Sequence, residues 1–154
     1  MDVKNENEIA IKQTIAENFT KLYKDNMEQS ILDENIQKIL SESLKYHCEG
    51  QIMTALFYVR VEVGITTSPV FHGEGGGFFT LVGGGALIGD IYVYCGSLSK
   101  LYKGTVSFQV DCVTIGAGYC NINFFDKNSN LLASFHAGQI GICSGIGGGT
   151  GKWE

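Results

Sequence analysis

The distribution of glycine divides this chain into two unlike parts. All 21 glycines of the 154 residues lie at position 50 or later, whereas residues 1–49 have none and carry a dense mixture of Lys, Asp and Glu. Glycine is a poor helix former and is frequent in turns. The asymmetry therefore predicts a helical N-terminal extension over residues 1–49 and a domain of strands and turns over residues 50–154.

Two apolar stripes in the first part predict two amphipathic helices, because one face of a helix repeats every three to four residues. The first stripe consists of Ile11, Ile15, Phe19 and Leu22. The second consists of Leu32, Ile36, Leu40 and Leu44, and Ile39 widens it. Residues 25–27 indicate a break, and Ser30 or Asp33 is expected to cap the second helix. We expect the helices to pack on the β domain or on a second copy of the chain, with disorder as the alternative.

From Gly50 the apolar pattern changes to a period of two. Alternation from Met53 to Ile65 predicts one long, half-buried strand with Phe57 on its inward face. The next stretch, which Pro69 stops or bends, runs to His72, and further strands are predicted over residues 78–82, 86–95, 105–113, 119–125, 131–137 and 139–146. The polar residues 126–130 indicate a hairpin loop. About eight short strands with regular turn signals are typical of a small sandwich or barrel.

Three runs of glycine lie in the second part, at residues 75–77, 83–85 and 147–149. A phosphate-binding loop lies between a strand and a helix and usually brings a Lys with a Ser or Thr, and these runs lack that context. Glycine beside strands more often marks a bulge, a barrel corner or a close approach of two backbones. We therefore interpret the runs as glycine-rich turns and corners of a coiled barrel.

Four segments around these glycines resemble the rhodococcal virulence-associated protein (Vap) family. They are FHGEGGGF at 71–78, GGGALIGDIY at 83–92, the hairpin at 121–138 and GIGGGTGKW at 145–153. The resemblance covers residues 51–154. It implies a mainly β fold, a short closed eight-stranded antiparallel β-barrel of Greek-key-like type, preceded here by the α-helical segment.

The same resemblance implies a biological setting. Family members are secreted by an intracellular bacterial pathogen and act on the host phagosome. They are not known as enzymes, and so no catalytic residue is carried over to this chain. Residues 1–8 are charged and lack the apolar core of a secretory signal. Secretion is therefore expected from the resemblance, with a cytoplasmic location as the alternative.

Charge and hydropathy exclude some partners. The formal net charge is −5 and Arg60 is the only arginine, so the chain lacks the clustered basic residues that bind nucleic-acid backbones. No apolar run approaches the roughly 18 residues of a transmembrane segment.

Five widely spaced cysteines without a CxxC pair are expected to be free thiols in the core. One disulfide bridge between neighbouring strands remains the alternative.

Titratable side chains show no spacing that is typical of a catalytic or metal site. None of His47, His72 and His136 has another His or Cys two to four residues further on. A nucleophile pair of His47 and Cys48 would need a spatial coincidence. The carboxylates of the β domain are expected on turns or outward faces, and they are Glu62, Glu74, Asp90, Asp111 and Asp126. We predict no catalytic residue, no metal and no cofactor, and therefore a protein that is not an enzyme.

The size of the inward side chains distinguishes a filled barrel from a ligand-binding one. The expected inward set includes large residues, namely Phe57, Phe79, Leu81, Phe108, Phe124 and Phe135. Large aromatic rings fill space, so we expect a closed core. A small-ligand barrel of the lipocalin or avidin type is the alternative function.

We expect the functional surface to lie outside the barrel. The candidate partner-binding residues are Tyr58, Tyr92, Tyr94, Tyr102 and Tyr119. Exposed aromatics bind partners or lipid, although they also occur as plain strand formers. The function expected is that of a non-enzymatic effector-like barrel that binds a host membrane lipid or protein, with self-association through the N-terminal helices. The rivals are a hydrolase built on the His and Cys residues and a module whose helices are the working part.

Overall fold

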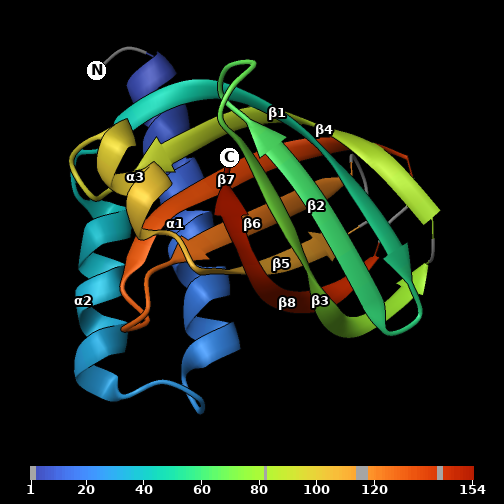
Figure 1. The fold of residues 1–154 in the computed structure, drawn as a ribbon. Coiled ribbons are helices and arrows are strands. Elements are labelled where there is room, and N and C mark those ends of the chain that lie inside the picture. The colour runs from blue at the N-terminus through green and yellow to red at the C-terminus, as the bar shows by residue number, and fades with distance from the viewer. Residues whose placement is uncertain (1–2, 82, 114–117, 142–143) are drawn as a thin grey trace.

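Two helices precede a barrel of strands and lie against its outer face (Figure 1). This computed structural model describes residues 3–81, 83–113, 118–141 and 144–154. The helices are α1 (Val3–Tyr23), α2 (Gln29–Leu40) and α3 (Leu98–Gly104). The strands are β1 (Leu44–Ala55), β2 (Tyr58–Gly64), β3 (Val70–Leu81), β4 (Gly83–Val93), β5 (Ser107–Val113), β6 (Tyr119–Phe125), β7 (Leu131–Gly141) and β8 (Ser144–Trp153).

The strands close into a barrel in the order β1-β2-β3-β8-β5-β6-β7-β4. Every neighbouring pair is antiparallel. Four of the pairings, β3–β8, β8–β5, β7–β4 and β4–β1, join strands that do not follow one another in the sequence. This confirms the predicted fold class, a mainly β chain with a closed eight-stranded antiparallel barrel behind a helical segment.

The apolar stripes of α1 and α2 pack on the barrel, which was one of the expected alternatives. The shared cluster is formed by Ile15, Phe19, Leu32 and Ile39 of the helices with Tyr92, Phe125 and Leu131 of the barrel. The break predicted at residues 25–27 lies between the two helices, as expected. Self-association through these helices stays a prediction.

The start of α2 differs from the prediction. The helix begins at Gln29, and Glu28 occupies the N-cap position without a side-chain cap bond. Ser30 and Asp33 therefore lie inside the helix, where neither can act as its cap. Gln29 instead donates from Nε2 to Asp33 Oδ1 at 2.8 Å, an exposed contact one turn apart.

The end of α2 also comes earlier than the stripe predicts. Ser41 is extended, and its amide donates to the carbonyls of Gln37 and Lys38, which ends the helix. Leu44 is the first residue of β1 and lies opposite Val93 of β4. Pairing with β4 therefore draws residues 44–49 into the barrel sheet, and β1 begins six residues before the predicted change at Gly50.

The single strand predicted from Met53 to Ile65 is wrong, because the chain turns back at Leu56 and Phe57. These two residues join β1 to β2. The turn changes which alternate positions face inward: Thr54 lies opposite Val59 and both are buried. Met53 faces outward, and Phe57, predicted to be inward, is 66% exposed. The apolar alternation continues through the turn and so conceals it.

The glycine runs at 75–77 and 147–149 lie within strands, so their interpretation as turns is wrong. They face each other in the β3–β8 pairing, with Gly76 opposite Gly148. The expected close approach of backbones is present there: a Cβ on Gly75 would lie 2.2 Å from the carbonyl oxygen of Gly148. The bounds of two predicted strands also differ: the strand predicted over 78–82 is the last part of β3, which begins at Val70, and the strand predicted over 139–146 is divided between the end of β7 and the start of β8.

An aromatic cluster fills the barrel. The ring of Phe71 lies 5.8 Å from that of Phe108, 5.0 Å from that of Phe124 and 5.6 Å from that of Trp153, measured between centroids. Glycine makes room for it, because a Cβ on Gly73 would lie 2.7 Å from the rings of both Phe71 and Phe108. Glycine in β3 and β8 therefore leaves space for the rings that Phe71 and Trp153 of the same two strands place in the core.

The predicted inward set is largely confirmed. Phe79, Phe108, Phe124 and Phe135 are all buried in the core. The side chain of Leu81 lies outside the described residues. In the described part of the chain the inward side chains fill the barrel, and the hollows are grooves on its outer surface.

Candidate functional surfaces

The five candidate tyrosines do not form one surface. Tyr92 is only 1% exposed, because α1 covers the outer face of β4, and the ammonium of Lys12 lies 5.8 Å from its ring centroid. Tyr94 packs in the same cluster. The expectation that these two side chains are exposed is therefore wrong. Burial raises the pKa of Tyr92 to about 12 and that of Tyr94 well above its usual range.

The other three tyrosines lie at different places on the barrel. Tyr119 is half-buried, stacks on His136 with 4.7 Å between ring centroids, and accepts a hydrogen bond from Asn18 Nδ2 at 3.2 Å. Tyr102 of α3 packs on Trp153 at 5.1 Å. Tyr58 is 37% exposed and donates its hydroxyl to Glu74 Oε2 at 2.9 Å. Of the five tyrosines, Tyr58 is the most exposed, and its role in partner binding stays a prediction.

A polar layer lies between α1 and the barrel. Asn121, Asn123 and Ser134 are fully buried although they occupy outward positions of β6 and β7. Asn123 Oδ1 accepts hydrogen bonds from Ser134 Oγ at 2.7 Å and from Asn121 Nδ2 at 3.3 Å, and Asn123 Nδ2 donates to Gln109 Oε1. These hydrogen bonds satisfy most of the buried polar groups in this layer, as burial requires.

His136 belongs to the same covered face. It lies between Asp90 of β4 and Asn121 of β6. Burial lowers the pKa of His136, and the nearby carboxylate of Asp90 partly offsets that effect. Its Nδ1 is buried and has no hydrogen-bond partner among the described residues. Its side chain points away from the barrel interior, and the ring of Tyr119 packs against it.

The side chains of His47 and Cys48 point in opposite directions from β1. His47 is exposed beside Glu49, whereas Cys48 is fully buried in the core. Burial raises the pKa of the Cys48 thiol to about 12, which leaves little of the reactive thiolate. His72 lies two strands away on β3 and faces Glu62 at 3.7 Å. Across the described ranges, no three His, Cys, Asp or Glu side chains gather as a metal site would require.

A groove of about 620 Å³ runs over the outer face of β2, β3 and β8. Its charges pair with one another: Arg60 with Glu62 at 3.0 Å, and Lys152 with Glu154 at 3.5 Å. Glu74 accepts from Tyr58. The carboxylates of this groove therefore lie on an open outward face with partners of their own, as the sequence predicted.

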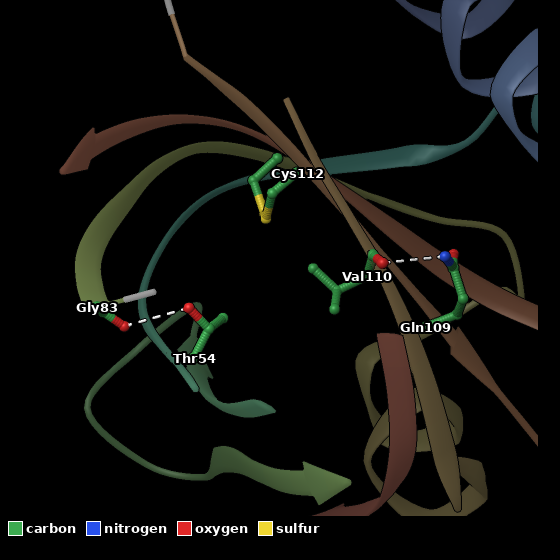
Figure 2. The surroundings of a disulfide bond; sticks show 6 residues. Thr54, Gly83, Gln109, Val110 and Cys112 are labelled. Atoms are coloured by element: carbon green, nitrogen blue, oxygen red, sulfur yellow. Dashed lines mark hydrogen bonds between the residues drawn. A yellow bond between two sulfur atoms is a disulfide. The ribbon is translucent and has the colours of Figure 1, made fainter. Parts of the chain in front are cut away.

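One pair of cysteines forms a disulfide. Cys112 of β5 and Cys120 of β6 lie directly opposite each other with 4.2 Å between their Cα atoms. Figure 2 shows Cys112 on the same side of β5 as Val110, whereas Gln109 points the other way. The expectation of free thiols is correct for Cys48 and Cys95 and wrong for this pair, which is the bridge between neighbouring strands that was left open. Cys143 lies outside the described residues.

The end of the barrel at the β1–β2 turn carries an apolar patch that the sequence analysis missed. Its members are exposed by about half or more, and they are Met53, Leu56, Phe57, Phe78 and Ile146. We refer to these five residues as the apolar end patch. The rings of Phe57 and Phe78 lie 6.1 Å apart, and the amide of Phe79 donates to the carbonyl of Leu56. The available signal was Leu56 and Phe57 themselves, two large apolar residues at a chain reversal.

The helices of the described chain are too short or too polar to cross a membrane. Among the described residues, His47, His72 and Cys48 do not meet at one place on the barrel. The architecture defines a class of small closed antiparallel barrels with an aromatic core.

Comparison with known proteins identifies the family within that class. A family model described as Rhodococcus equi virulence-associated protein matches residues 4–154, and the chain belongs to this family. The match includes the helices as well as the barrel, and so extends beyond the residues 51–154 that carried the resemblance. No curated protein matches the chain.

Two solved structures are similar to this one. VapD from the intracellular pathogen Rhodococcus equi is 35% identical with a TM-score of 0.66, over 74% of this chain and 100% of that one. VapB from the same organism is 35% identical with a TM-score of 0.64, over 73% of this chain and 98% of that one. The similarity supports the fold assignment independently of the sequence patterns.

Proposed function

We propose that this protein is a non-enzymatic, secreted, effector-like barrel that acts by binding a host component, either a membrane lipid or a protein. Membership of a virulence-associated family supports a role toward a host. The observation that carries the proposal is the combination of a filled interior with the exposed apolar end patch. Contiguous exposed apolar side chains on a small protein often mark an interaction site.

Binding is favoured over catalysis by the placement of reactive groups. A nucleophile needs an activating base within hydrogen-bond reach, whereas the thiol of Cys48 faces the core and His47 faces solvent. The carboxylates Glu62 and Glu74 have partners of their own on an open face. The filled core likewise offers no support for a lipocalin- or avidin-like function.

Secretion is supported by the Cys112–Cys120 disulfide. Disulfides persist in oxidising surroundings outside the cytoplasm and are rare where thiols are kept reduced. A cytoplasmic protein of this family would more simply keep both thiols free.

The test measures binding to host material directly. Labelled protein is mixed with a host-cell homogenate, membranes and cytosol are separated, and excess unlabelled protein is added as competitor. Saturable, competed retention in either fraction is the expected result, and heat-denatured protein is the control. Retention equal to that control, together with turnover of any member of a hydrolase substrate panel, would contradict the proposal.

A further inference from the structure

The apolar end patch lies at the end of the barrel where β1, β3, β5 and β7 end and β2, β4, β6 and β8 begin. The β1–β2 turn at this end consists of Leu56 and Phe57, and neither residue is charged. Figure 1 shows the β1–β2 turn at the opposite side of the molecule from α2 and α3.

A second hairpin of the same barrel shows how unusual this turn is. Residues 126–130, which join β6 to β7 at the other end, are Asp, Lys, Asn, Ser and Asn. They form an ordinary polar turn in which Asp126 Oδ1 accepts the amides of Asn128 and Asn130. Leu56 and Phe57 contribute no such turn chemistry, and the rings of Phe57 and Phe78 remain 66% and 57% exposed.

Polarity increases in steps along β2 and β3 away from this end. Phe57 and Phe78 lie outermost, and Tyr58 follows with its ring exposed and its hydroxyl on Glu74. Arg60 and Glu74, the first charged residues of these two strands, lie opposite each other one step further along. Charges also border the patch on its other sides, where Arg60 lies opposite Met53 and Asp111 lies opposite Ile146. The order along β2 and β3 is the one found across a bilayer interface, where apolar side chains lie deepest, amphipathic tyrosines lie at the level of the headgroups and charged groups lie in water.

A second copy of the chain is a poorer occupant for this patch. Half-exposed side chains of this size offer on the order of 100 Å² each, and the five together roughly 500 Å². A stable dimer buries about 800 Å² per partner. A projecting two-residue turn also lacks the flat, self-complementary shape of a two-fold interface, whereas single side chains can each enter a fluid bilayer.

We propose that the apolar end patch inserts into the interface of a lipid bilayer, so that membrane lipid is the host component bound. This inference rests on the proposed function and deepens it. Insertion uses apolar burial and not charge attraction, because the five residues of the apolar end patch include no basic residue and the net charge of the chain is −5. Binding therefore needs no anionic lipid and withstands salt.

Vesicle flotation with the full chain tests the insertion. Wild-type protein should float with pure phosphatidylcholine vesicles as well as with vesicles that contain phosphatidylserine, at both about 0.1 M and about 1 M NaCl. The double variant F57S/F78S should bind at least about tenfold less, because it removes the apolar burial. The matched control is L40S, which changes a residue of similar exposure on α2, and it should float like wild type.

A fluorescence measurement places the contact. The single native tryptophan, Trp153, is 7% exposed and lies at the other end of the barrel. Brominated lipids should therefore quench F57W and leave the wild-type emission unchanged. Both substituted side chains are exposed, so circular dichroism and thermal unfolding of F57S/F78S should match wild type.

The outcomes separate the inference from the proposed function. Absence of wild-type flotation, equal flotation of F57S/F78S, or binding only to anionic vesicles and lost in salt overturns the insertion. A wild-type dimer in sedimentation that F57S/F78S abolishes assigns the patch to a second copy and also overturns it. If the protein does not float with pure lipid vesicles but is still retained by host homogenate, the proposed function stands with a protein partner. If neither vesicles nor homogenate bind the protein, both the insertion and the proposed function are rejected.

Discussion

Gly75 of β3 lies directly opposite Gly149 of β8, and neither position has room for a side chain. A Cβ on Gly75 would lie 2.2 Å from the carbonyl oxygen of Gly148, and one on Gly149 would lie 2.2 Å from that of Glu74. The obstacles are backbone atoms of the neighbouring strand and not the ends of flexible side chains. The two strands can accept a methyl group there only by moving apart.

The substitution Gly75→Ala should therefore destabilise the barrel by about 3 kcal/mol or more, since it overpacks a backbone contact. Chemical denaturation measures this. Gly76→Ala is the matched control, because the nearest atom to its added Cβ is 3.4 Å away, and its stability should stay within about 1 kcal/mol of wild type. Equal stabilities of the two variants would show that the β3–β8 contact tolerates side chains.

Asn35 fixes the helical segment to the barrel. Its Nδ2 donates to the carbonyl of Ser129 at 3.1 Å, and its Oδ1 accepts the amide of Leu131 at 3.0 Å. Asn35→Leu leaves the buried amide of Leu131 without its partner and removes the bond to the part-buried carbonyl of Ser129, at a cost of about 1–3 kcal/mol. Hydrogen exchange should show faster exchange in α2 and at Leu131. Gln37→Leu, at an exposed position of the same helix, should leave the exchange unchanged.

The stability of the protein should fall on mild acidification because of His136. Burial lowers the pKa of this side chain in the folded state, so the unfolded chain binds the proton first. The contribution is present above the unfolded pKa of about 6.5 and is lost as the pH falls below it. The variant His136→Gln should weaken this dependence in denaturation measured on both sides of that pH. If the free energy of unfolding of the variant falls on acidification by as much as that of wild type, the effect belongs to groups other than His136.

The local elements of the fold were predictable and the distant pairings were not. The β6–β7 hairpin followed from its polar loop and the alternation on both sides, and Leu87, Ile91 and Val93 face inward as the period of two indicates. The glycine runs were misplaced in turns because their partners lie some 70 residues away along the chain. When two glycine runs pair across neighbouring strands, the sequence of neither run indicates the pairing.

The candidate surface was less predictable for a similar reason. Tyr92 has the alternation of a solvent-facing strand residue, and its burial depends on α1, which lies far earlier in the sequence. Phe57 was assigned to the core because an apolar residue in an apolar alternation is expected to be inward. Its exposure follows from the turn, which reverses the chain without glycine, asparagine or proline. An exposed patch built from core-like residues is therefore the part of the surface that the sequence pattern conceals.

The Cys112–Cys120 disulfide gives the last prediction. It links two paired strands across a separation of eight residues, and a loop of that length corresponds to a stabilisation of about 2.5 kcal/mol. Reduction, or the double variant C112S/C120S, should lower the free energy of unfolding by about this amount, yet the barrel should still fold because the strand pairing of β5 with β6 continues on one side of the bridge. Denaturation with and without reductant measures the effect. Cys95→Ser is the control, because this thiol is free and lies outside the bridge, and the variant should respond to reductant as wild type does. If reductant leaves the free energy of unfolding of wild type unchanged, the bridge adds no stability.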